Sequence, residues 1–354
     1  MFDPLYKLLA YYDQREDLQK AFPEVEDGKF KNLFLWASYA SQNLYGDKHA
    51  YEYLKKYTNF YYNARDFETL LPNLNFNTLP EVFFIFGAGR SGTTLTKRIL
   101  NSHSMIRVLG EGESYDSVNH PHVLKFERIF EAQRKWLGLS CAALTECLED
   151  IIAFPIPDHD DNLSKQMRIL YSNQPIIFLV RDVRDRTLSM FNMIKKTDSD
   201  FNGMIDLYES WIKHNTVLES QFSEDITRIE NLENKLLGYI SLEWKIKNSM
   251  YFRYKEKGLP VLQVKYEDLI LKTKQTVNNM ISFLNLPFEN DVLEVHKKPH
   301  LTIPGTDMEP NFDNVKREID THSIGTYEKT FDSKQIDEIL EISGDMMKKL
   351  DYIQ

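Results

Sequence analysis

The chain has 354 residues with 42% hydrophobic and 27% charged side chains, an ordinary globular composition that excludes a disordered or low-complexity protein. The 53 acidic residues outnumber the 43 basic ones, and the net charge of −10 argues against nonspecific nucleic-acid binding. With two cysteines, no secretory signal pattern and no apolar run of about 18 residues, the sequence predicts a cytoplasmic protein without a disulfide scaffold or a membrane span. No group of His and Cys has the spacing of zinc ligands, so we expect no metal.

The first 78 residues predict a helical N-terminal region, distinct from a second domain at 79–354. Apolar residues recur at helical spacing between Phe2 and Tyr12. The aromatic segment from Tyr51 to Tyr62 is typical of a core or docking surface. Prolines and asparagines between Leu71 and Pro80 predict the linker between the two parts.

Beyond the linker, short apolar runs alternate with long helical segments. The runs predicted as strands are Val82–Phe86, Ile176–Val180 and Val261–Val264, with a shorter one at Ile106–Leu109. The predicted helices include Phe126–Leu137, Ala142–Ile152 and Thr273–Leu284, and the acidic segment 197–238 is expected to form surface helices. This order predicts an α/β fold, in which helices cover both faces of a parallel sheet.

A glycine-rich loop, Gly87-Ala88-Gly89-Arg90-Ser91-Gly92-Thr93-Thr94, joins the first predicted strand to a helix from about Thr93. Such a loop binds anions, because its backbone N–H groups and the positive end of the helix attract negative charge. The glycines permit close approach, and Thr93 and Thr94 add hydroxyl donors. The alternative is a simple turn between strand and helix.

The loop nearly fits the pattern of nucleoside triphosphatases, with Gly87 and Gly92 correctly spaced. Thr93 stands where that pattern requires a lysine for the β- and γ-phosphates. The substitution indicates a nucleotide without a triphosphate. Arg90 supplies a cation inside the loop, and its planar guanidinium can bridge a transferring group and its leaving oxygen.

The segment Val82–Leu95 resembles the 5′-phosphosulfate loop of sulfotransferases that use 3′-phosphoadenosine 5′-phosphosulfate (PAPS). Arginine at position 90 is closer to the tyrosylprotein and carbohydrate branches than to the cytosolic branch, which carries lysine there. The resemblance implies a P-loop-like parallel sheet flanked by helices and metal-free use of PAPS, with 3′,5′-diphosphoadenosine (PAP) as product. The loop residues that it implies in nucleotide binding are Gly89, Arg90, Ser91, Gly92, Thr93 and Thr94.

A second motif begins at the end of the strand Ile176–Val180, with Arg181 directly after it and Ser189 eight residues further on. It resembles the 3′-phosphate motif of the same family, in which an arginine and a serine clamp the extra phosphate. A dianionic phosphate suits a guanidinium fork and a hydroxyl. Two alternatives are a surface ion-pair cluster between Arg181 and Arg186, and a magnesium-binding aspartate at Asp182.

A third match is the Tyr-Glu-Asp-Leu segment that starts at Tyr266. The resemblance places Tyr266 near the adenosine, whereas the plainer alternative is a core tyrosine at a strand end. Lys316 falls where the tyrosylprotein branch has a nucleotide-binding lysine. The resemblance covers roughly residues 80 to 330.

Transfer of the sulfuryl group to a hydroxyl or amine requires a base that takes the acceptor's proton. By analogy with phosphoryl transfer, the rest of the catalysis is positioning of the reactants and stabilisation of charge. In tyrosylprotein sulfotransferases a Gly-Glu-Glu segment carries the base, and counting from Arg90 places it at Glu111. A local alignment with one extra residue allows Glu113 instead. Either carboxylate could also be a solvated loop residue.

His159 competes for this role, because it lies 22 residues before Arg181, the spacing of the catalytic histidine in the cytosolic branch. The flanking Lys-x-His-x-Pro of that branch is absent here. Three neighbouring acids favour the protonated imidazole and make it a poorer base. The catalytic lysine of the tyrosylprotein branch has no counterpart, with Lys165 and Arg168 as the candidates for a second cation.

These motifs predict a sulfotransferase that acts by in-line transfer with a carboxylate base. The alternatives are a P-loop kinase-like enzyme, which needs the missing lysine, and a non-catalytic nucleotide-binding scaffold. The acceptor remains open among a tyrosyl peptide, a glycan, a lipid and a small metabolite. The sequence leaves the oligomeric state open as well.

Overall fold

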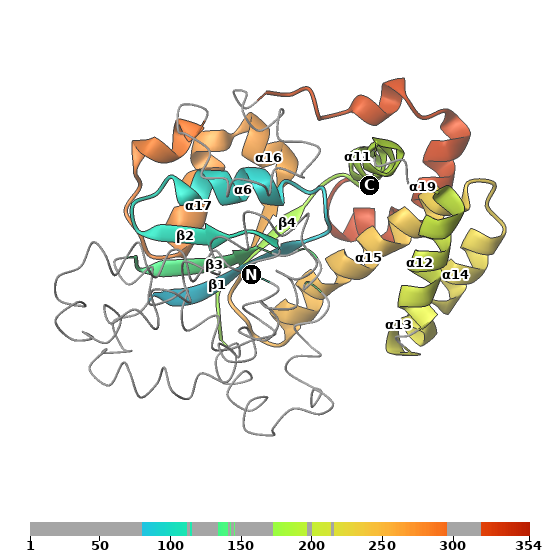
Figure 1. Cartoon of the computed structure of the whole chain (residues 1–354), viewed down its shortest axis with the longest axis horizontal. Coiled ribbons are helices and arrows are strands. Elements are labelled where there is room, and N and C mark those ends of the chain that lie inside the picture. Colours follow the sequence, from blue (N-terminus) through green and yellow to red (C-terminus); the bar gives the residue numbers. More distant parts are fainter. Residues whose placement is uncertain are drawn as a thin grey trace, which may run out of the picture.

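The computed structural model describes residues 80–111, 114, 134–140, 142, 145, 173–196, 200–213, 216–295 and 320–354. At its centre is a five-stranded parallel sheet with the order β2-β3-β1-β4-β5 (Figure 1). The strands are β1 (Glu81–Gly87), β2 (Ile106–Leu109), β3 (Trp136–Ser140), β4 (Ile176–Val180) and β5 (Val261–Lys265). The predicted α/β fold is confirmed.

The described helices lie on both sides of this sheet. They are α6 (Thr93–Asn101), α11 (Val183–Lys196), α12 (Phe201–Lys213), α13 (Thr216–Gln221), α14 (Ser223–Glu230), α15 (Lys235–Glu256), α16 (Tyr266–Leu271), α17 (Thr273–Phe283) and α19 (Ser333–Lys349), with the 3-10 turns η4 (Asn290–Leu293) and η6 (Thr326–Lys329). Within the described ranges, none of the helices combines the length and the apolar character needed to cross a bilayer.

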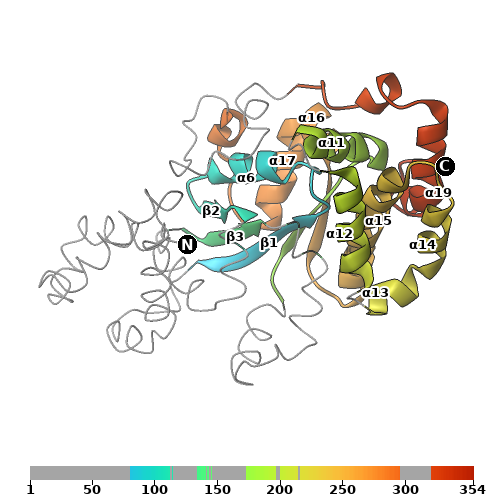
Figure 2. The ribbon, with the colours of Figure 1, turned by 45° about the vertical axis from the view of Figure 1, so that its right-hand side comes forward.

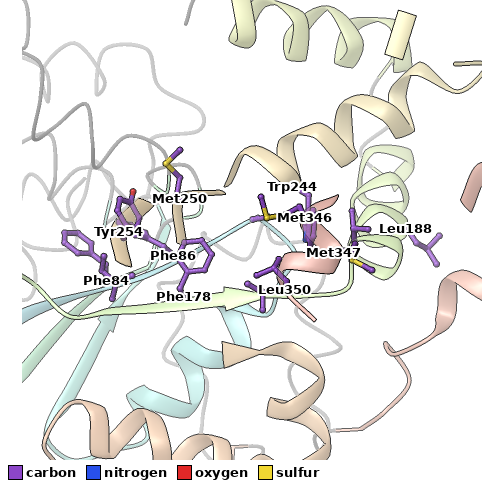
Figure 3. Packing of buried hydrophobic residues seen from close by; sticks show 14 of the residues in the cluster. Phe84, Phe86, Phe178, Leu188, Trp244, Met250, Tyr254, Met346, Met347 and Leu350 are labelled. Carbon is purple, nitrogen blue, oxygen red and sulfur yellow. The ribbon is translucent and has the colours of Figure 1, made fainter. Parts of the chain in front are cut away.

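The side chains of β1 alternate between two cores, as the two-residue repeat of a strand requires. Phe84 and Phe86 pack in one core with Trp244 of α15, and Figure 3 shows all three within it. Phe83 packs in the other core with Met280 of α17. Because both faces are covered, the central strands are apolar throughout, which is why their continuous apolar runs were readable in the sequence.

Helices α12, α13 and α14 gather beside α15 at one end of the molecule (Figure 2). The acidic segment 197–238 therefore forms helices, as predicted, but these helices are not merely a surface layer. Ile212, Phe222 and Ile229 are buried in a core of their own with Ile240 of α15. Asp206, Glu219, Glu224 and Glu230 are exposed on the outer faces of these amphipathic helices, whereas Asp225 of α14 is buried.

The predicted helix Phe126–Leu137 is wrong at its end, because Trp136 and Leu137 begin strand β3. This strand is buried along its whole length between β1 and β2. Its glycine makes room for a neighbour, since a Cβ at Gly138 would lie 2.5 Å from Cζ of Phe83. A five-residue apolar run has no period that separates a strand from a helix end. The predicted N-terminal region 1–78, the range 126–133 and most of Ala142–Ile152 lie outside the described residues.

Candidate active site

The glycine-rich loop lies where the direction of the sheet's strand order reverses. After β1 the chain forms β2 and β3 on one side of it, and then β4 and β5 on the other. In open α/β sheets, ligands bind outside the carboxyl ends of the strands at such a point. The loop that follows β1 and leads into α6 therefore occupies the expected ligand position.

The backbone of the loop explains its glycines. Gly92, the N-cap of α6, has φ +97°, and a Cβ there would lie 2.7 Å from Cδ2 of Tyr266. Gly87 has φ +139°, and a Cβ there would lie 2.2 Å from the carbonyl oxygen of Leu179. Arg90 also has a positive φ, of 69°, which is uncommon for a residue other than glycine and often marks a functional site.

The two predicted nucleotide motifs meet at this loop. Arg181 donates from Nη1 to the carbonyl oxygen of Arg90 over 2.9 Å, and Nε of Arg90 donates to Oγ of Ser189 over 3.3 Å. Ser189 projects from α11, whereas Arg90 precedes α6. Arg181 is 91 positions from Arg90 in the sequence and Ser189 is 99 positions from it, yet the fold brings the three residues into one cluster.

Tyr266 closes one side of the cluster. The guanidinium of Arg181 lies over its ring, 4.4 Å from the centroid. The Tyr266 hydroxyl and Oγ of Ser323 are within hydrogen-bonding distance at 2.9 Å, and Nη2 of Arg181 donates to the carbonyl oxygen of Ser323 over 2.6 Å. Sequence analysis did not single out Ser323, because no spacing links it to Arg181.

Asp185 on α11 holds the segment that carries Ser323. Its carboxylate accepts hydrogen bonds from the backbone N–H of Gly325 over 2.6 Å, the hydroxyl of Thr326 over 2.9 Å and the N–H of Tyr327 over 3.1 Å. Asp185 is buried, with 2% of its surface exposed. The segment at 323–327 is therefore fastened to the same helix that supplies Ser189.

The charged residues between Arg181 and Arg186 are not a surface ion-pair cluster as a whole. Arg184 does pair with Asp182, at 2.5 Å between Nη2 and Oδ2, and this hydrogen bond raises the pKa of Arg184. Asp182 also accepts from Nε of Arg184 over 2.9 Å. Arg186, by contrast, is fully buried and donates from Nε to the carbonyl oxygen of Gly89 over 2.9 Å.

Two buried polar atoms of the loop region have no hydrogen-bond partner among the residues that the structure describes. They are Oγ of Ser91 and Nε of Arg181. A buried donor left without a partner costs about 1–3 kcal/mol, so a ligand that accepted hydrogen bonds from these two atoms would remove that cost. Both are donors, which fits an anionic ligand such as a nucleotide phosphate. No group of three or more His, Cys, Asp or Glu in the described ranges could hold a metal ion.

Glu111 follows β2, and Ala142 connects it to the loop. Its Oε1 accepts a hydrogen bond from the backbone N–H of Ala142 over 3.1 Å. Ala142 in turn borders the loop, because its Cβ is 4.0 Å from where a Cβ of Gly89 would lie. The other residues singled out in the sequence fall outside the described residues: Glu113, His159, Lys165, Arg168 and Lys316.

Two further residues, Thr145 and Tyr254, hold the start of the loop, and neither was singled out from the sequence. Oγ1 of Thr145 accepts from the N–H of Gly87 over 3.1 Å and donates to the carbonyl oxygen of Gly87 over 3.0 Å. The hydroxyl of Tyr254 on α15 donates to the carbonyl oxygen of Thr145. The start of the loop is thus tied through Thr145 to α15.

Comparison with known proteins gives the family. Residues 80–351 match the family model of the sulfotransferase domain. Similar solved structures include the sulfotransferase domain of the curacin biosynthetic pathway (TM-score 0.48, 16% identity, covering 78% of this chain and 99% of that one) and the sulfotransferase domain of the Synechococcus PCC 7002 olefin synthase (TM-score 0.43, 16% identity, 75% and 95%). A third is a sulfotransferase from Alicyclobacillus acidocaldarius (TM-score 0.37, 16% identity, 61% and 88%). No curated protein matches the chain. Because the family match spans more than half of its length, the chain belongs to the sulfotransferase domain family and is a sulfotransferase.

Proposed function

We propose that this sulfotransferase takes its sulfuryl group from PAPS and passes it to a hydroxyl or amine with Glu111 as the base. The observation that carries the proposal is the cluster of Arg90, Arg181 and Ser189, joined by bonds of 2.9 and 3.3 Å. In this cluster a loop suited to the 5′-phosphosulfate lies next to the guanidinium of Arg181 and the hydroxyl of Ser189, which suit the 3′-phosphate. Arginine at position 90 favours the tyrosylprotein and carbohydrate branches.

The donor is assigned to the loop and its surroundings. Backbone and hydroxyl groups from Gly89 to Thr94 would hold the 5′-phosphosulfate, with the unpartnered Oγ of Ser91 as one donor. Arg181 and Ser189 would hold the 3′-phosphate. Tyr266 is assigned to the adenosine side because its ring lies against Arg181, and Lys316 is a further candidate ligand.

When bound, PAPS supplies a sulfuryl group on a phosphate leaving group. The acceptor oxygen or nitrogen forms a bond to sulfur as the sulfur–oxygen bond to the phosphate breaks, and PAP leaves. Glu111 takes the acceptor's proton, and its hydrogen bond from Ala142 orients the carboxylate. Arg90 stabilises the charge that develops on the leaving oxygen. Glu113 and His159 are the rival bases.

A kinase-like reading is less well supported. Thr93 replaces the lysine that serves a triphosphate, and the carboxylate of Asp182 is engaged by the guanidinium of Arg184 in two hydrogen bonds, of 2.9 and 2.5 Å. A magnesium-binding aspartate in that position would have to give up this pairing.

The proposal is tested by incubating the chain with PAPS that carries radiolabelled sulfate and, in separate reactions, a tyrosyl peptide, a glycan, a lipid alcohol and a small alcohol. We expect label in at least one acceptor class, and its loss in Arg90→Ala. Labelling of no acceptor, together with phosphate transfer from magnesium-ATP, would refute the proposal in favour of the kinase-like enzyme.

A further inference from the structure

Helix α15 carries a largely buried carboxylate, that of Glu243, whose side chain is 12% exposed, beside two buried cations. Glu243 and Lys247 stand one helical turn apart, where side chains of a helix are neighbours. Oε2 of Glu243 lies 2.5 Å from Nη2 of Arg186, which projects from α11. Arg186 is 0% exposed and Lys247 4% exposed, so both charges are removed from solvent.

Glu243 keeps its negative charge in this position. Burial acts to raise its pKa, but the positive charges of Arg186 and Lys247 outweigh burial, and the pKa lies below its ordinary value. Helix α12 packs over the group, since the Tyr208 hydroxyl donates to Glu243 over 3.4 Å and the ring of Trp211 lies 6.0 Å from Nζ of Lys247. The Glu243 carboxylate therefore balances the positive charges of Arg186 and Lys247.

Each of these cations also holds one backbone carbonyl of the candidate active site. Arg186 donates from Nε to the carbonyl oxygen of Gly89 in the loop, over 2.9 Å. Lys247 donates from Nζ to the carbonyl oxygen of Ala142, over 2.7 Å. The N–H of Ala142 in turn donates to Glu111, over 3.1 Å. Two series of contacts, called routes below, therefore start at Glu243. The first runs through Arg186 to the phosphate loop, and the second runs through Lys247 and Ala142 to the proposed base, Glu111.

We propose that Glu243 is a positioning residue, which sets the phosphate loop through Arg186 and sets Glu111 through Lys247 and Ala142. The inference rests on the proposed role of Glu111 as base. An uncompensated buried charge is strongly destabilising, so loss of Glu243 would displace both cations from their carbonyls. A displacement of about 1 Å can cost about 10²-fold in rate even when the change is remote from the chemistry.

The two routes are separated by two variants, with kcat and the Kd of PAP measured for each. Lys247→Met interrupts only the route to Glu111, so kcat should fall about 10–100-fold while the Kd of PAP stays parental. Arg186→Lys keeps a charge but cannot serve Gly89, Ile240 and Glu243 at once, so the Kd of PAP should rise. Glu243→Gln should change both quantities.

Asp225→Asn is the matched control. Asp225 is a buried carboxylate, with 5% of its surface exposed, that pairs with another lysine of α15, Lys245, at 2.8 Å and with Arg228 at 3.3 Å. Its loss should lower the melting temperature and leave kcat and the Kd of PAP parental. Such a result attributes the effects of the other variants to the two routes rather than to a weakened α15.

The inference is overturned if Lys247→Met and Arg186→Lys change kcat and Kd no more than Asp225→Asn does, or if each variant lowers kcat and raises the Kd of PAP by the same factor. Glu111→Gln is measured alongside. If it retains parental turnover, the base is wrong and the inference falls with it. If it is inactive while Lys247→Met is parental, the inference alone fails. Should Glu243→Gln not fold, the two single-route variants decide.

Discussion

Arg181 donates a hydrogen bond from Nη1 to the backbone carbonyl oxygen of Arg90, over 2.9 Å. Arg90 has a positive φ of 69°, a conformation that costs about 1–2 kcal/mol for a residue with a side chain. Arg181, from the predicted 3′-phosphate motif, therefore holds the glycine-rich loop at Arg90, the residue whose backbone is strained. The two motifs form a single unit, so loss of the Arg181 side chain should disturb the loop as well as the proposed 3′-phosphate site.

Arg181→Ala and Ser189→Ala should both weaken binding of PAP while the fold persists. A hydrogen bond to a charged group contributes about 1.5–3 kcal/mol, and Arg181 also loses its bond to Arg90, so the arginine change should have the larger effect. Calorimetric titration with PAP measures both. Parental affinity in the two variants would mean that the second motif has been misread.

Glu111→Gln should lower turnover about 10²–10⁴-fold, the contribution of a positioned general base. Its amide keeps the oxygen that accepts from Ala142, so the Kd of PAP should change little. Steady-state kinetics beside titration with PAP separates the two quantities.

Glu113→Gln and His159→Ala are the companion variants for Glu111→Gln. We expect both to retain turnover. An inactive His159→Ala beside a fully active Glu111→Gln would transfer the role of base to the histidine.

Gly92→Ala should abolish binding of PAP. The new Cβ would lie 2.7 Å from the ring of Tyr266, at a φ of +97°. That ring has little freedom to move, because its hydroxyl contacts Ser323 and its face lies against Arg181. Gly258→Ala is the control: it has a φ of +75° but nothing within 4 Å of its Cβ, so it should lose about 1–2 kcal/mol of stability and bind PAP normally. Equal binding by the two variants would contradict this packing argument.

The stability contributed by Glu243 should depend on pH. Its pKa in the folded chain is lowered from the ordinary 4.5, since the charges of Arg186 and Lys247 outweigh burial. A carboxylate with a lowered folded pKa stabilises the protein above its unfolded pKa, and this stability is lost as the pH falls through the folded pKa. Chemical denaturation should show the wild type exceeding Glu243→Gln most at about pH 7, with the difference shrinking below 4.5. A difference independent of pH would contradict the ion-pair account.

Much of the fold and part of the site could be predicted from the sequence. Strands β1 and β4 were readable because both faces of the sheet are covered, which makes Val82–Phe86 and Ile176–Val180 continuously apolar. The loop and Arg181 could be predicted as nucleotide ligands because that chemistry is tied to short local spacings, and the structure brings the two together. Strand β3 could not be predicted, because Trp136–Ser140 is short and forms a strand through its pairing with β1 and β2.

The contacts that hold the site in place could not be predicted. Arg186 reaches Gly89 across 97 residues and Glu243 across 57, and Lys247 reaches Ala142 across 105. A charged residue in a sequence carries no mark of burial, and the sequence around Arg186 fitted a solvated ion-pair cluster equally well. Only the packing of α11 against α15 turns these charges inward.

The central claim is that Arg181 and the loop form a site for a nucleotide with a 3′-phosphate. The most direct measurement is calorimetric titration of the wild type with PAP and with adenosine 5′-monophosphate, without metal. The account predicts that PAP binds about 10–100-fold more tightly, because a charged hydrogen bond of about 1.5–3 kcal/mol recognises the extra phosphate, and that Arg181→Ala loses this preference. Equal affinity for the two nucleotides in the wild type would contradict it.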